Sequence, residues 1–454
     1  MPNKCAWANL TLLDPALVQV VTLAMRHAHY EILEDGTVYG EIPGFQGVYA
    51  QANTEDECHE ELQWLEGWIG LGLRLGTRYR AMWYVDVSAA AHSRAGLGRY
   101  SENMAHALAE ARPGQVALFH NLGKGGKRPE SLRHLPARQV NWGYKPWRMA
   151  VWLAHLSHIS FNRLVPDAAL FHSTEHLLMP LHGIPTVLTV HDLIFKLFPE
   201  HHKKLNYWYL NLAMPLFCRR ATAIVAVSQA TKRDVVQHYG IDAAKIHVVH
   251  EAPASHFSPP PPAKTTHVRQ QYALPDHYLI HLSTIEPRKN LLRLLDSLQA
   301  LRQTFPSLSL VLAGGKGWLY DECFAKMEAM GLQEAVQLLG WVPDDDLPAI
   351  LAAADLAVQP SLYEGFGLPL LEHMASGQVV AASNSSSHPE VGGDAAAYFD
   401  PTHTDDMTAT IRRLLTDRDE YAHRRQLGLE HVRHFTWQRA AAETITLYEQ
   451  LLKL

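Results

Sequence analysis

The feature that most constrains the fold is an alternation of strand-like and helix-like segments on both sides of a proline run. Four consecutive prolines, Pro259–Pro262, follow Ser258 and favour an extended, stiff connection. Short apolar runs typical of buried parallel strands recur before and after this linker, with helical patterns between them. The expected strands span residues 82–87, 170–172, 186–190 and 223–227, then 278–282, 308–313, 336–339, 356–359, 379–382 and 397–399.

Two such α/β stretches predict two facing Rossmann-like domains with a cleft between them. We expect the first domain over residues 81–258 and the second over residues 263–434. A last helix from about Thr436 would make residues 435–454 a segment that crosses back to the first domain. Residues 1–80 are then left as a separate small domain.

The small domain over residues 1–80 is predicted to have the order β-β-β-α. Its strands are expected at residues 30–32, 38–42 and 47–51. Glu34–Gly36 supplies the first turn, and Thr54 and Glu57 have the spacing of a helix capping box. The helix that follows carries an apolar stripe formed by Cys58, Leu62, Leu65 and Ile69.

Composition excludes several classes of protein. The chain has 454 residues and a formal net charge of −6, which disfavours a global binder of nucleic acid. No stretch of about 18 uncharged apolar residues is present, and the short apolar run at 15–25 is not expected to be a signal peptide. The 28 histidines show no metal-ligand spacing. Disulfide scaffolds and cysteine zinc sites are disfavoured because the cysteines lie far apart, at Cys5, Cys58, Cys218 and Cys323.

The strongest candidate site is the segment Pro360–Glu372, which follows an expected buried strand. Its glycines allow backbone N–H groups to approach a ligand closely, and Pro369 suits the first turn of a helix. A helix N-terminus that faces a cleft is a ready site for an anion. Glu364 and Glu372 lie on either side of the glycines. A ligand with a phosphate and several hydroxyls would satisfy all of these groups.

Simpler interpretations stand beside the functional ones. Gly96 and Gly98 could be ordinary turn glycines, because a lone G-x-G is a weak signal. His191 and Asp192 could form a structural pair at a strand end. The acidic run Asp344–Asp346 suggests a metal site at first sight, but we interpret it as the start of a helix at Leu347.

The chain from about residue 83 to residue 454 resembles the family-4 retaining glycosyltransferases of the GT-B fold. Glu364 to Glu372 matches the E-x7-E motif of that family, with the surrounding P-S-x-Y-E-G-F-G-L-P-x-L-E context. Ser283–Thr284 departs from the usual Gly-Thr, and we expect it to tighten the nearby loop. Further matching segments are residues 96–100, 189–193, 285–291, 313–318 and 340–342.

The resemblance implies a nucleoside-diphosphate sugar as donor and no obligatory metal or other cofactor. Residues 263–434 would bind the donor, and residues 81–258 would face the acceptor. Arg288 and Lys289 would neutralise the charge that develops on the leaving diphosphate. Glu364 would hold sugar hydroxyls or lie near the reacting face.

Further roles follow from the same resemblance. Glu372 would accept hydrogen bonds from the ribose hydroxyls. His191 would contact the transferred sugar or the diphosphate. The glycines at positions 96 and 98 would admit the diphosphate close to the first domain. Backbone N–H groups would add to diphosphate binding at Gly365, Phe366, Gly367 and Leu368.

Part of the small domain resembles the HicB-type antitoxin domain. The similar segments are residues 40–48, 52–54 and 65–68. In that family the domain pairs with a small toxin and usually carries a DNA-binding appendage. No helix-turn-helix or ribbon appendage is visible in this sequence, so we expect an interaction or dimerisation module rather than a regulator of transcription.

The first expected Rossmann-like domain, residues 81–258, contains a basic segment. Residues 123–148 hold seven basic side chains against one acid, Glu130, with Trp142, Tyr144 and Trp147 between them. This mixture suits an anionic membrane surface or a phosphate-bearing lipid acceptor. The alternative is a solvated loop of the acceptor-side domain.

Together these observations predict a retaining glycosyltransferase that moves a hexose, mannose or glucose, to a glycan or lipid-linked acceptor. We expect it in the cytoplasm, with peripheral contact to the inner face of the membrane as an added hypothesis. Front-face attack is favoured over a covalent intermediate, and the sequence leaves both routes open. The alternatives are a toxin-neutralising or regulatory protein that acts through its HicB-like domain, or another GT-B enzyme such as a sugar-nucleotide epimerase or a phosphorylase.

Overall fold

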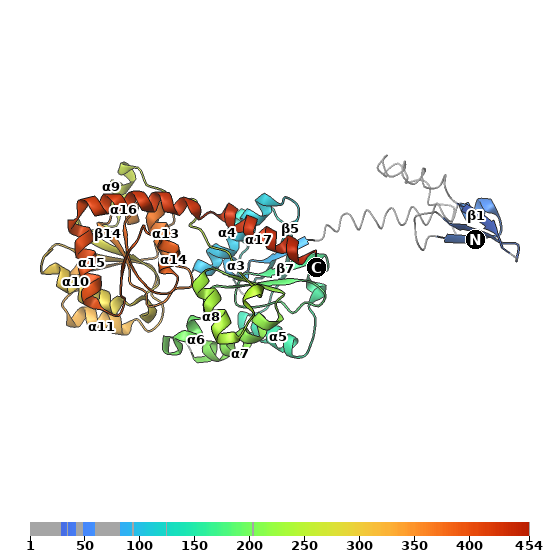
Figure 1. The fold of residues 1–454 in the computed structure, drawn as a ribbon, viewed down its shortest axis with the longest axis horizontal. Helices are drawn as coiled ribbons and strands as arrows, with labels where there is room; N and C mark the ends of the chain where they lie inside the picture. The colour runs from blue at the N-terminus through green and yellow to red at the C-terminus, as the bar shows by residue number, and fades with distance from the viewer. Residues whose placement is uncertain are drawn as a thin grey trace. The chain divides into compact units, whose positions relative to one another are not determined.

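The computed structural model describes residues 29–33, 35–41, 49–59, 82–92, 95–123, 125–201 and 204–453. The chain divides into two compact units, Met1–Ala81 and Met82–Leu454. Figure 1 shows the elements of both units with the labels used below.

The first unit contains an antiparallel sheet in the order β1-β2-β3. A turn with Gly36 at φ +83° joins its first two strands. Residues 55–59 are helical, and Thr54 Oγ1 accepts the backbone N–H of Glu57 at 3.3 Å, as the capping box predicts. The later stripe residues Leu62, Leu65 and Ile69, the segment 65–68 and the apolar run at 15–25 lie outside the described residues. The strands are β1 (His29–Ile32), β2 (Val38–Glu41) and β3 (Tyr49–Ala52).

The second unit begins with a parallel sheet of seven strands, in the order β10-β9-β8-β7-β4-β5-β6. All neighbouring strands in it run parallel. Its strands are β4 (Met82–Asp86), β5 (Val116–Asn121), β6 (Ala137–Val140), β7 (Ala168–Ser173), β8 (Thr186–Val190), β9 (Ala223–Ala226) and β10 (Ile246–Val248).

Three strands of this sheet were not expected from the sequence. β5 is fully buried but ends in a histidine and an asparagine, and β10 has only three residues. β6 is an edge strand, mostly exposed and half polar, so it shows no apolar run. The sequence of such a strand gives almost no local signal, because its strand conformation depends on pairing with the neighbouring strand β5.

A second parallel sheet has six strands in the order β13-β12-β11-β14-β15-β16. Four of the six expected strands in this domain begin where the sequence predicts. The strands are β11 (Tyr278–Leu282), β12 (Ser309–Ala313), β13 (Val336–Gly340), β14 (Leu356–Gln359), β15 (Val380–Ser383) and β16 (Ala397–Phe399). Two helix-covered parallel sheets in one unit confirm the predicted GT-B architecture.

Helices cover both faces of the first sheet (Figure 1). The packing of α4 against Trp83 and Val85 forms one core, and the packing of α5 and α7 against Tyr84 and Phe171 forms another. The helices of this domain are α3 (Ser88–Ala91), α4 (Ala95–Ala111), α5 (Tyr144–Leu156), α6 (Ile194–Leu197), α7 (Lys204–Arg220) and α8 (Gln229–Tyr239). Short 3-10 turns span Glu130–Leu132, Asn162–Leu164, Pro199–His201 and Ala243–Lys245.

The second sheet is covered in the same way. Its α-helices are α9 (Pro262–Gln271), α10 (Leu291–Arg302), α11 (Asp321–Ala329), α12 (Leu347–Ala352), α13 (Leu368–Ala375), α14 (His388–Gly392), α15 (Thr404–Thr416) and α16 (Arg418–His431). Its 3-10 turns are Pro287–Lys289, Gln333–Ala335 and Val432–His434.

The last helix, α17 (Trp437–Leu451), packs against α4 of the first sheet domain. The ring of Tyr448 lies 5.1 Å from that of Trp83, and its hydroxyl is 2.5 Å from His172 Nδ1. Arg112 and Glu449 form an ion pair at 2.7 Å on the same contact. The end of the chain therefore ties the second sheet domain back to the first.

Candidate active site

The loop between β14 and α13 forms the centre of the candidate site. Gly367 is the N-cap residue of α13 at φ +100°, a conformation that favours glycine, and Pro369 lies in the first turn. Among the described residues, the backbone N–H groups of Gly365, Phe366 and Gly367 donate to no protein acceptor. Three free donors beside a helix N-terminus form a site suited to an anion such as a diphosphate.

Glu364 is held between two cations in this loop. Its carboxylate lies 2.6 Å from Arg288 Nη1 and 2.7 Å from Lys289 Nζ. All three side chains are at most 13% exposed. Arg288 also pairs with Glu286, so two buried cations are balanced by two carboxylates. The structure thus brings together three of the residues that the sequence singles out.

The electrostatics of this cluster keep Glu364 charged. Burial opposes ionisation, yet Arg288 and Lys289 hold the pKa of Glu364 well below its usual range. Burial, and then the neighbouring Arg288, lower the pKa of Lys289. An incoming diphosphate would reverse this effect on Lys289, because a second anion stabilises the ammonium form.

A short turn places the two cations. Pro287–Lys289 forms a 3-10 turn that ends at Asn290, at φ +59°. Asparagine tolerates this left-handed conformation, and its Nδ2 donates to the carbonyls of Pro360 and Pro401 at 3.0 and 2.8 Å. The turn is therefore fixed to the same loop that carries Glu364.

Glu372 lies in α13, where its buried carboxylate meets Arg99 of α4. Arg99 Nη1 is 3.0 Å from Glu372 Oε1, and Arg99 Nη2 is 2.7 Å from Asp344. Burial raises the pKa of Glu372 to about 7, and Arg99 only partly offsets this rise. The ion pair and the raised pKa are compatible because desolvation outweighs one partly exposed cation.

His191 follows β8 and is buried. Its Nδ1 lies 3.0 Å from Glu251 Oε1, and its Nε2 lies 2.9 Å from the carbonyl of Thr174. Burial opposes the imidazolium, but Glu251 and this carbonyl raise the pKa of His191 above its usual value. Both ring nitrogens therefore donate to protein groups, and the side chain presents no free nitrogen to a ligand in this arrangement.

The backbone of His191 contacts the loop between β14 and α13 directly. A Cβ atom on Gly365 would lie 1.9 Å from the carbonyl oxygen of His191, so only glycine fits there. The carbonyl of Gly365 accepts the hydroxyls of Ser228 and Thr231 at 2.6 and 3.2 Å. The loops after β8 and β14 thus meet at a point where backbone lies against backbone.

Gly96 and Gly98 lie in the first turn of α4, not in a loop before it. Helix α4 begins at Ala95, so both glycines have helical neighbours on either side. A Cβ atom on Gly98 would lie 3.2 Å from the carbonyl of Ala89 in α3, whereas Gly96 faces open space. Gly98 therefore allows close packing of two helices.

The helix predicted after the acidic run begins at Leu347 as expected, but the run does not cap it through a side chain. Asp346 is the N-cap residue, but its side chain makes no cap hydrogen bond. It pairs with Lys264 and accepts the hydroxyl of Tyr272 at 2.7 Å instead. Asp344 pairs with Arg99, so part of this run belongs to the contact between the two sheet domains.

The departure at Ser283–Thr284 has a local explanation. Ser283 Oγ lies 2.6 Å from His281 Nε2 and 3.1 Å from the carbonyl of Thr284. A Cβ atom on Gly314 would lie 2.0 Å from the carbonyl oxygen of Ser283. The Ser283 hydroxyl is thus bonded within its own segment, and Gly314 is the residue that lets the two backbone segments pack closely.

Several supporting residues were missed by the sequence reasoning. Ser386 Oγ accepts the backbone N–H of Glu364 at 2.8 Å, and Ser387 Oγ donates to Phe366 at 2.6 Å. Both belong to a serine run after β15, and such a run after a buried strand was the available signal. Glu390 binds the N–H groups of Gln229 and Ala230 across the two sheet domains.

Two family models match the two sheet domains. Residues 94–252 match the model described as Glycosyltransferase Family 4, and residues 264–430 match Glycosyl transferases group 1. O-antigen chain mannosyltransferase B of Escherichia coli is 31% identical over 370 residues, which cover 78% of this chain and 96% of that protein. The two-domain fold is that of a GT-B glycosyltransferase, and the chain belongs to the family-4 glycosyltransferases.

Other comparisons agree with this placement. The serotype-specific mannosyltransferase WbdA of Escherichia coli is 30% identical over 288 residues, 61% of this chain but only 35% of that protein. The Anabaena HepE structure with UDP and glucose has a TM-score of 0.62 at 20% identity, covering 82% of this chain and all of its own. Sucrose-phosphate synthase of Thermosynechococcus elongatus has a TM-score of 0.65 at 17% identity, over 82% of this chain and 99% of its own. Both structures show the GT-B fold.

The small N-terminal unit has its own match. A model described as UPF0150-like covers residues 19–79, which confirms the HicB-like resemblance. Among the helices that the structure describes, none combines the length and hydropathy needed to cross a bilayer.

Proposed function

We propose that the chain is a retaining mannosyltransferase that uses a nucleoside-diphosphate mannose and extends a lipid-linked polysaccharide. The observation that carries this proposal is the carboxylate of Glu364, held between Arg288 and Lys289 beside three free backbone N–H groups. Mannose is favoured because both Escherichia coli relatives described above are named mannosyltransferases. The polysaccharide acceptor follows from the name of the O-antigen relative.

In the proposed reaction, the bond between the anomeric carbon and the diphosphate oxygen breaks. The diphosphate gains negative charge, which Lys289, Arg288 and the N–H groups of 365–367 stabilise. The acceptor hydroxyl attacks from the face that the diphosphate leaves, and its proton passes to a diphosphate oxygen. This route retains the anomeric configuration and needs no obligatory metal, because cationic side chains supply the positive charge.

The remaining residues position the donor in this proposal. Glu372 accepts hydrogen bonds from the ribose hydroxyls after its ion pair with Arg99 has broken. Glu364 orients the sugar hydroxyls near the reacting carbon. His191 acts through its backbone and its place against Gly365, since both ring nitrogens are already bonded to protein groups.

The test is an incubation of the full chain with nucleoside-diphosphate sugars and a mannan acceptor, followed by NMR of the anomeric signals. The proposal expects mannose transfer, with the anomeric configuration of the donor kept in the product. Transfer of glucose alone would contradict the donor assignment, and an inverted product would contradict the retaining route.

A further inference from the structure

The outer faces of two helices in the first sheet domain are apolar where helices that face water are normally polar. Fourteen large hydrophobic side chains are exposed among the described residues, and nine of them lie between Trp142 and Leu212. Two of the nine, Trp142 and Ile159, flank α5. The other seven are on α5 or α7, at Tyr144, Met149, Leu153, Leu156, Leu205, Trp208 and Leu212.

Helix α5 is apolar on both of its sides. Trp147 and Val151 pack into the core of the sheet domain, whereas Met149, Leu153 and Leu156 point the other way and are 43–51% exposed. A helix that is hydrophobic all round is normally buried on all sides. Its outer face therefore requires a covering that the described part of the second unit does not supply.

Helices α5 and α7 are neighbours in the first sheet domain (Figure 1), and contacts near both of their ends show that they run in the same direction. Near their starts, Arg148 Nη1 donates to Asn206 Oδ1 at 2.9 Å, and the guanidinium lies 3.9 Å from the ring centre of Tyr209. Near their ends, the rings of His155 and Phe217 are 5.2 Å apart. The outer stripes therefore join into one surface, the α5–α7 surface, formed by Met149, Leu153, Leu156, Leu205, Trp208 and Leu212.

The charge of these helices is as one-sided as their hydrophobicity. Neither α5 nor α7 contains an aspartate or a glutamate, although the whole chain has a formal net charge of −6. The two helices contribute five basic residues, Lys145, Arg148, Lys204, Arg219 and Arg220. A surface that is both apolar and basic complements an anionic interface better than the surface of a neutral protein.

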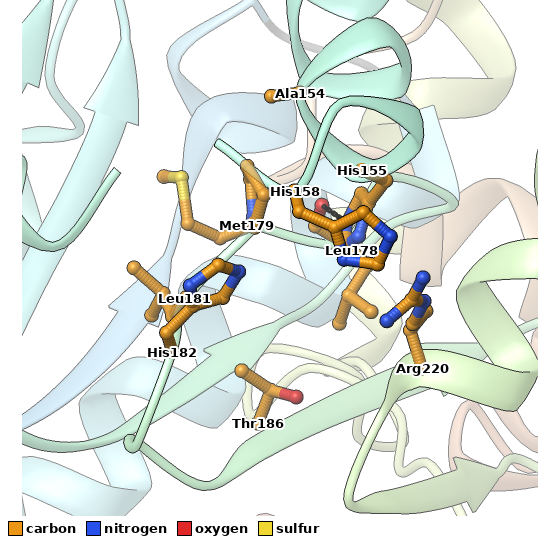
Figure 2. A pocket seen from close by; sticks show the side chains of 10 residues that line it. Ala154, His155, His158, Leu178, Met179, Leu181, His182, Thr186 and Arg220 are labelled. Carbon is orange, nitrogen blue, oxygen red and sulfur yellow. Dashed lines mark hydrogen bonds between the residues drawn. The ribbon is translucent and has the colours of Figure 1, made fainter. Parts of the chain in front are cut away.

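A pocket of about 130 Å³ lies at the C-terminal ends of the two helices. Figure 2 shows the side chains of His158, His182 and Arg220 around it. The described lining contains no carboxylate. His158 of the pocket lining lies in sequence between Leu156 and Ile159, which are 51% and 55% exposed, so the lining directly follows the apolar stripe of α5 along the chain.

We propose that the α5–α7 surface docks on an anionic lipid membrane and that the pocket beside it takes a lipid phosphate. The inference rests on the proposed function in one respect, because a lipid-linked acceptor would be presented at such a membrane. Leucine and tryptophan side chains enter the boundary between headgroups and acyl chains, while the arginines bind phosphates. A protein partner or a second copy of the chain are the outcomes that the test separates from this one.

The test is flotation of the full chain with vesicles of phosphatidylglycerol and phosphatidylcholine, compared with phosphatidylcholine alone. We expect binding to the anionic vesicles only, weakened by salt. Leu205→Ser with Leu212→Ser should lower the partition coefficient about tenfold or more. The matched control is Leu319→Ser with Leu338→Ser, two exposed leucines of the second sheet domain, which should bind like the unchanged protein.

Two neighbouring arginines test the pocket separately from the surface. Arg219 and Arg220 are both exposed at the end of α7, but only Arg220 lines the pocket. Each substitution removes one charge near the membrane, a loss of roughly fivefold in partitioning. Arg220→Ser should cost clearly more than Arg219→Ser. Equal losses would overturn the assignment of a phosphate to the pocket.

Other results would overturn the docking proposal itself. These are no flotation at low salt, or unchanged flotation of the Leu205 and Leu212 variant. Sedimentation of the protein alone is the second readout, and a dimer that this variant dissociates would assign the surface to a second copy. Donor hydrolysis should persist in all variants. Absence of hydrolysis together with the expected flotation pattern would reject the proposed function and leave the docking surface standing.

Discussion

The guanidinium of Arg99 lies 3.0 Å from a carboxylate oxygen of Glu372, although the two residues are 273 positions apart in the chain. Arg99 belongs to α4, the second helix after β4, and Glu372 belongs to α13, the helix that follows the loop after β14. Arg99 thus forms an ion pair with the carboxylate that, by the family resemblance, would bind the donor ribose. Under the proposed function, binding of the donor at Glu372 would therefore compete with this contact between the two sheet domains.

The first prediction concerns the stability of the protein without donor. Burial raises the pKa of Glu372 to about 7, above that of an ordinary glutamate, so this carboxyl favours the fold below about pH 4.5 and loses that contribution as the pH rises through 7. Glu372→Gln, which stays neutral, should therefore have a free energy of unfolding at pH 8 that is higher than that of the unchanged protein by at most about 3 kcal/mol. It should melt at a correspondingly higher temperature. At pH 5 the two should melt alike. Equal melting temperatures at both pH values would contradict a raised pKa.

The second prediction concerns the cation beside Glu364. Lys289→Met should reduce donor hydrolysis and transfer by about a hundredfold or more, because a charge that meets the developing diphosphate is lost. The fold should persist, since Glu364 keeps its pair with Arg288. Lys326→Met, at a half-exposed pair with Asp296, is the control and should retain full activity. Equal rates in the two variants would remove Lys289 from the mechanism.

A third prediction follows from the lowered pKa of Lys289. The ammonium form binds a diphosphate, and burial beside Arg288 makes this form easier to lose. Donor affinity should therefore fall as the pH rises toward 10, at a pH below the usual range of lysine. Calorimetric titration with the donor between pH 7 and pH 10 measures this fall. The Lys289→Met variant should show a flatter profile, and the same slope in both proteins would assign the effect to another group.

The fourth prediction tests the contact between the two loops. Gly365→Ala would place a methyl group 1.9 Å from the carbonyl oxygen of His191, a contact that forces the loops apart. We expect loss of the donor-induced thermal shift and a larger radius in X-ray scattering. Gly143→Ala is the matched control, because φ is −58° there and the added methyl group would lie no closer than 3.4 Å to a neighbouring atom. An active Gly365→Ala protein would mean that the loops need not meet.

Much of the fold could be predicted because it is encoded locally. The strands β8, β11, β14 and β16 have the predicted bounds, since each is a short, mostly apolar run. Ser228 has a side chain typical of a helix N-cap, and it caps α8 by accepting the N–H of Thr231. The edge strand β6 has no such run. The start of α4 at Ala95 could not be predicted, because the glycines in its first turn are also typical of a loop.

The candidate site divides in the same way. Glu364, Arg288 and Lys289 could be found because two short motifs carry them. The partners of Arg99 and Glu390 could not, since each contact joins segments more than a hundred residues apart and depends on how the two sheet domains close. The ring of His191 was expected to face the donor, whereas its bonds to Glu251 and Thr174 depend on tertiary packing.

The most direct test of the central claim is a thermal-shift titration of the full chain with UDP-, GDP- and ADP-linked mannose and glucose. The protein and its Glu372→Ala and Lys289→Met variants are measured side by side. A ligand that binds the folded state raises its melting temperature by mass action. We predict that one mannose donor shifts the unchanged protein and fails to shift either variant. No shift with any donor, or the same shift in all three proteins, would contradict the assignment of this site to a nucleotide sugar.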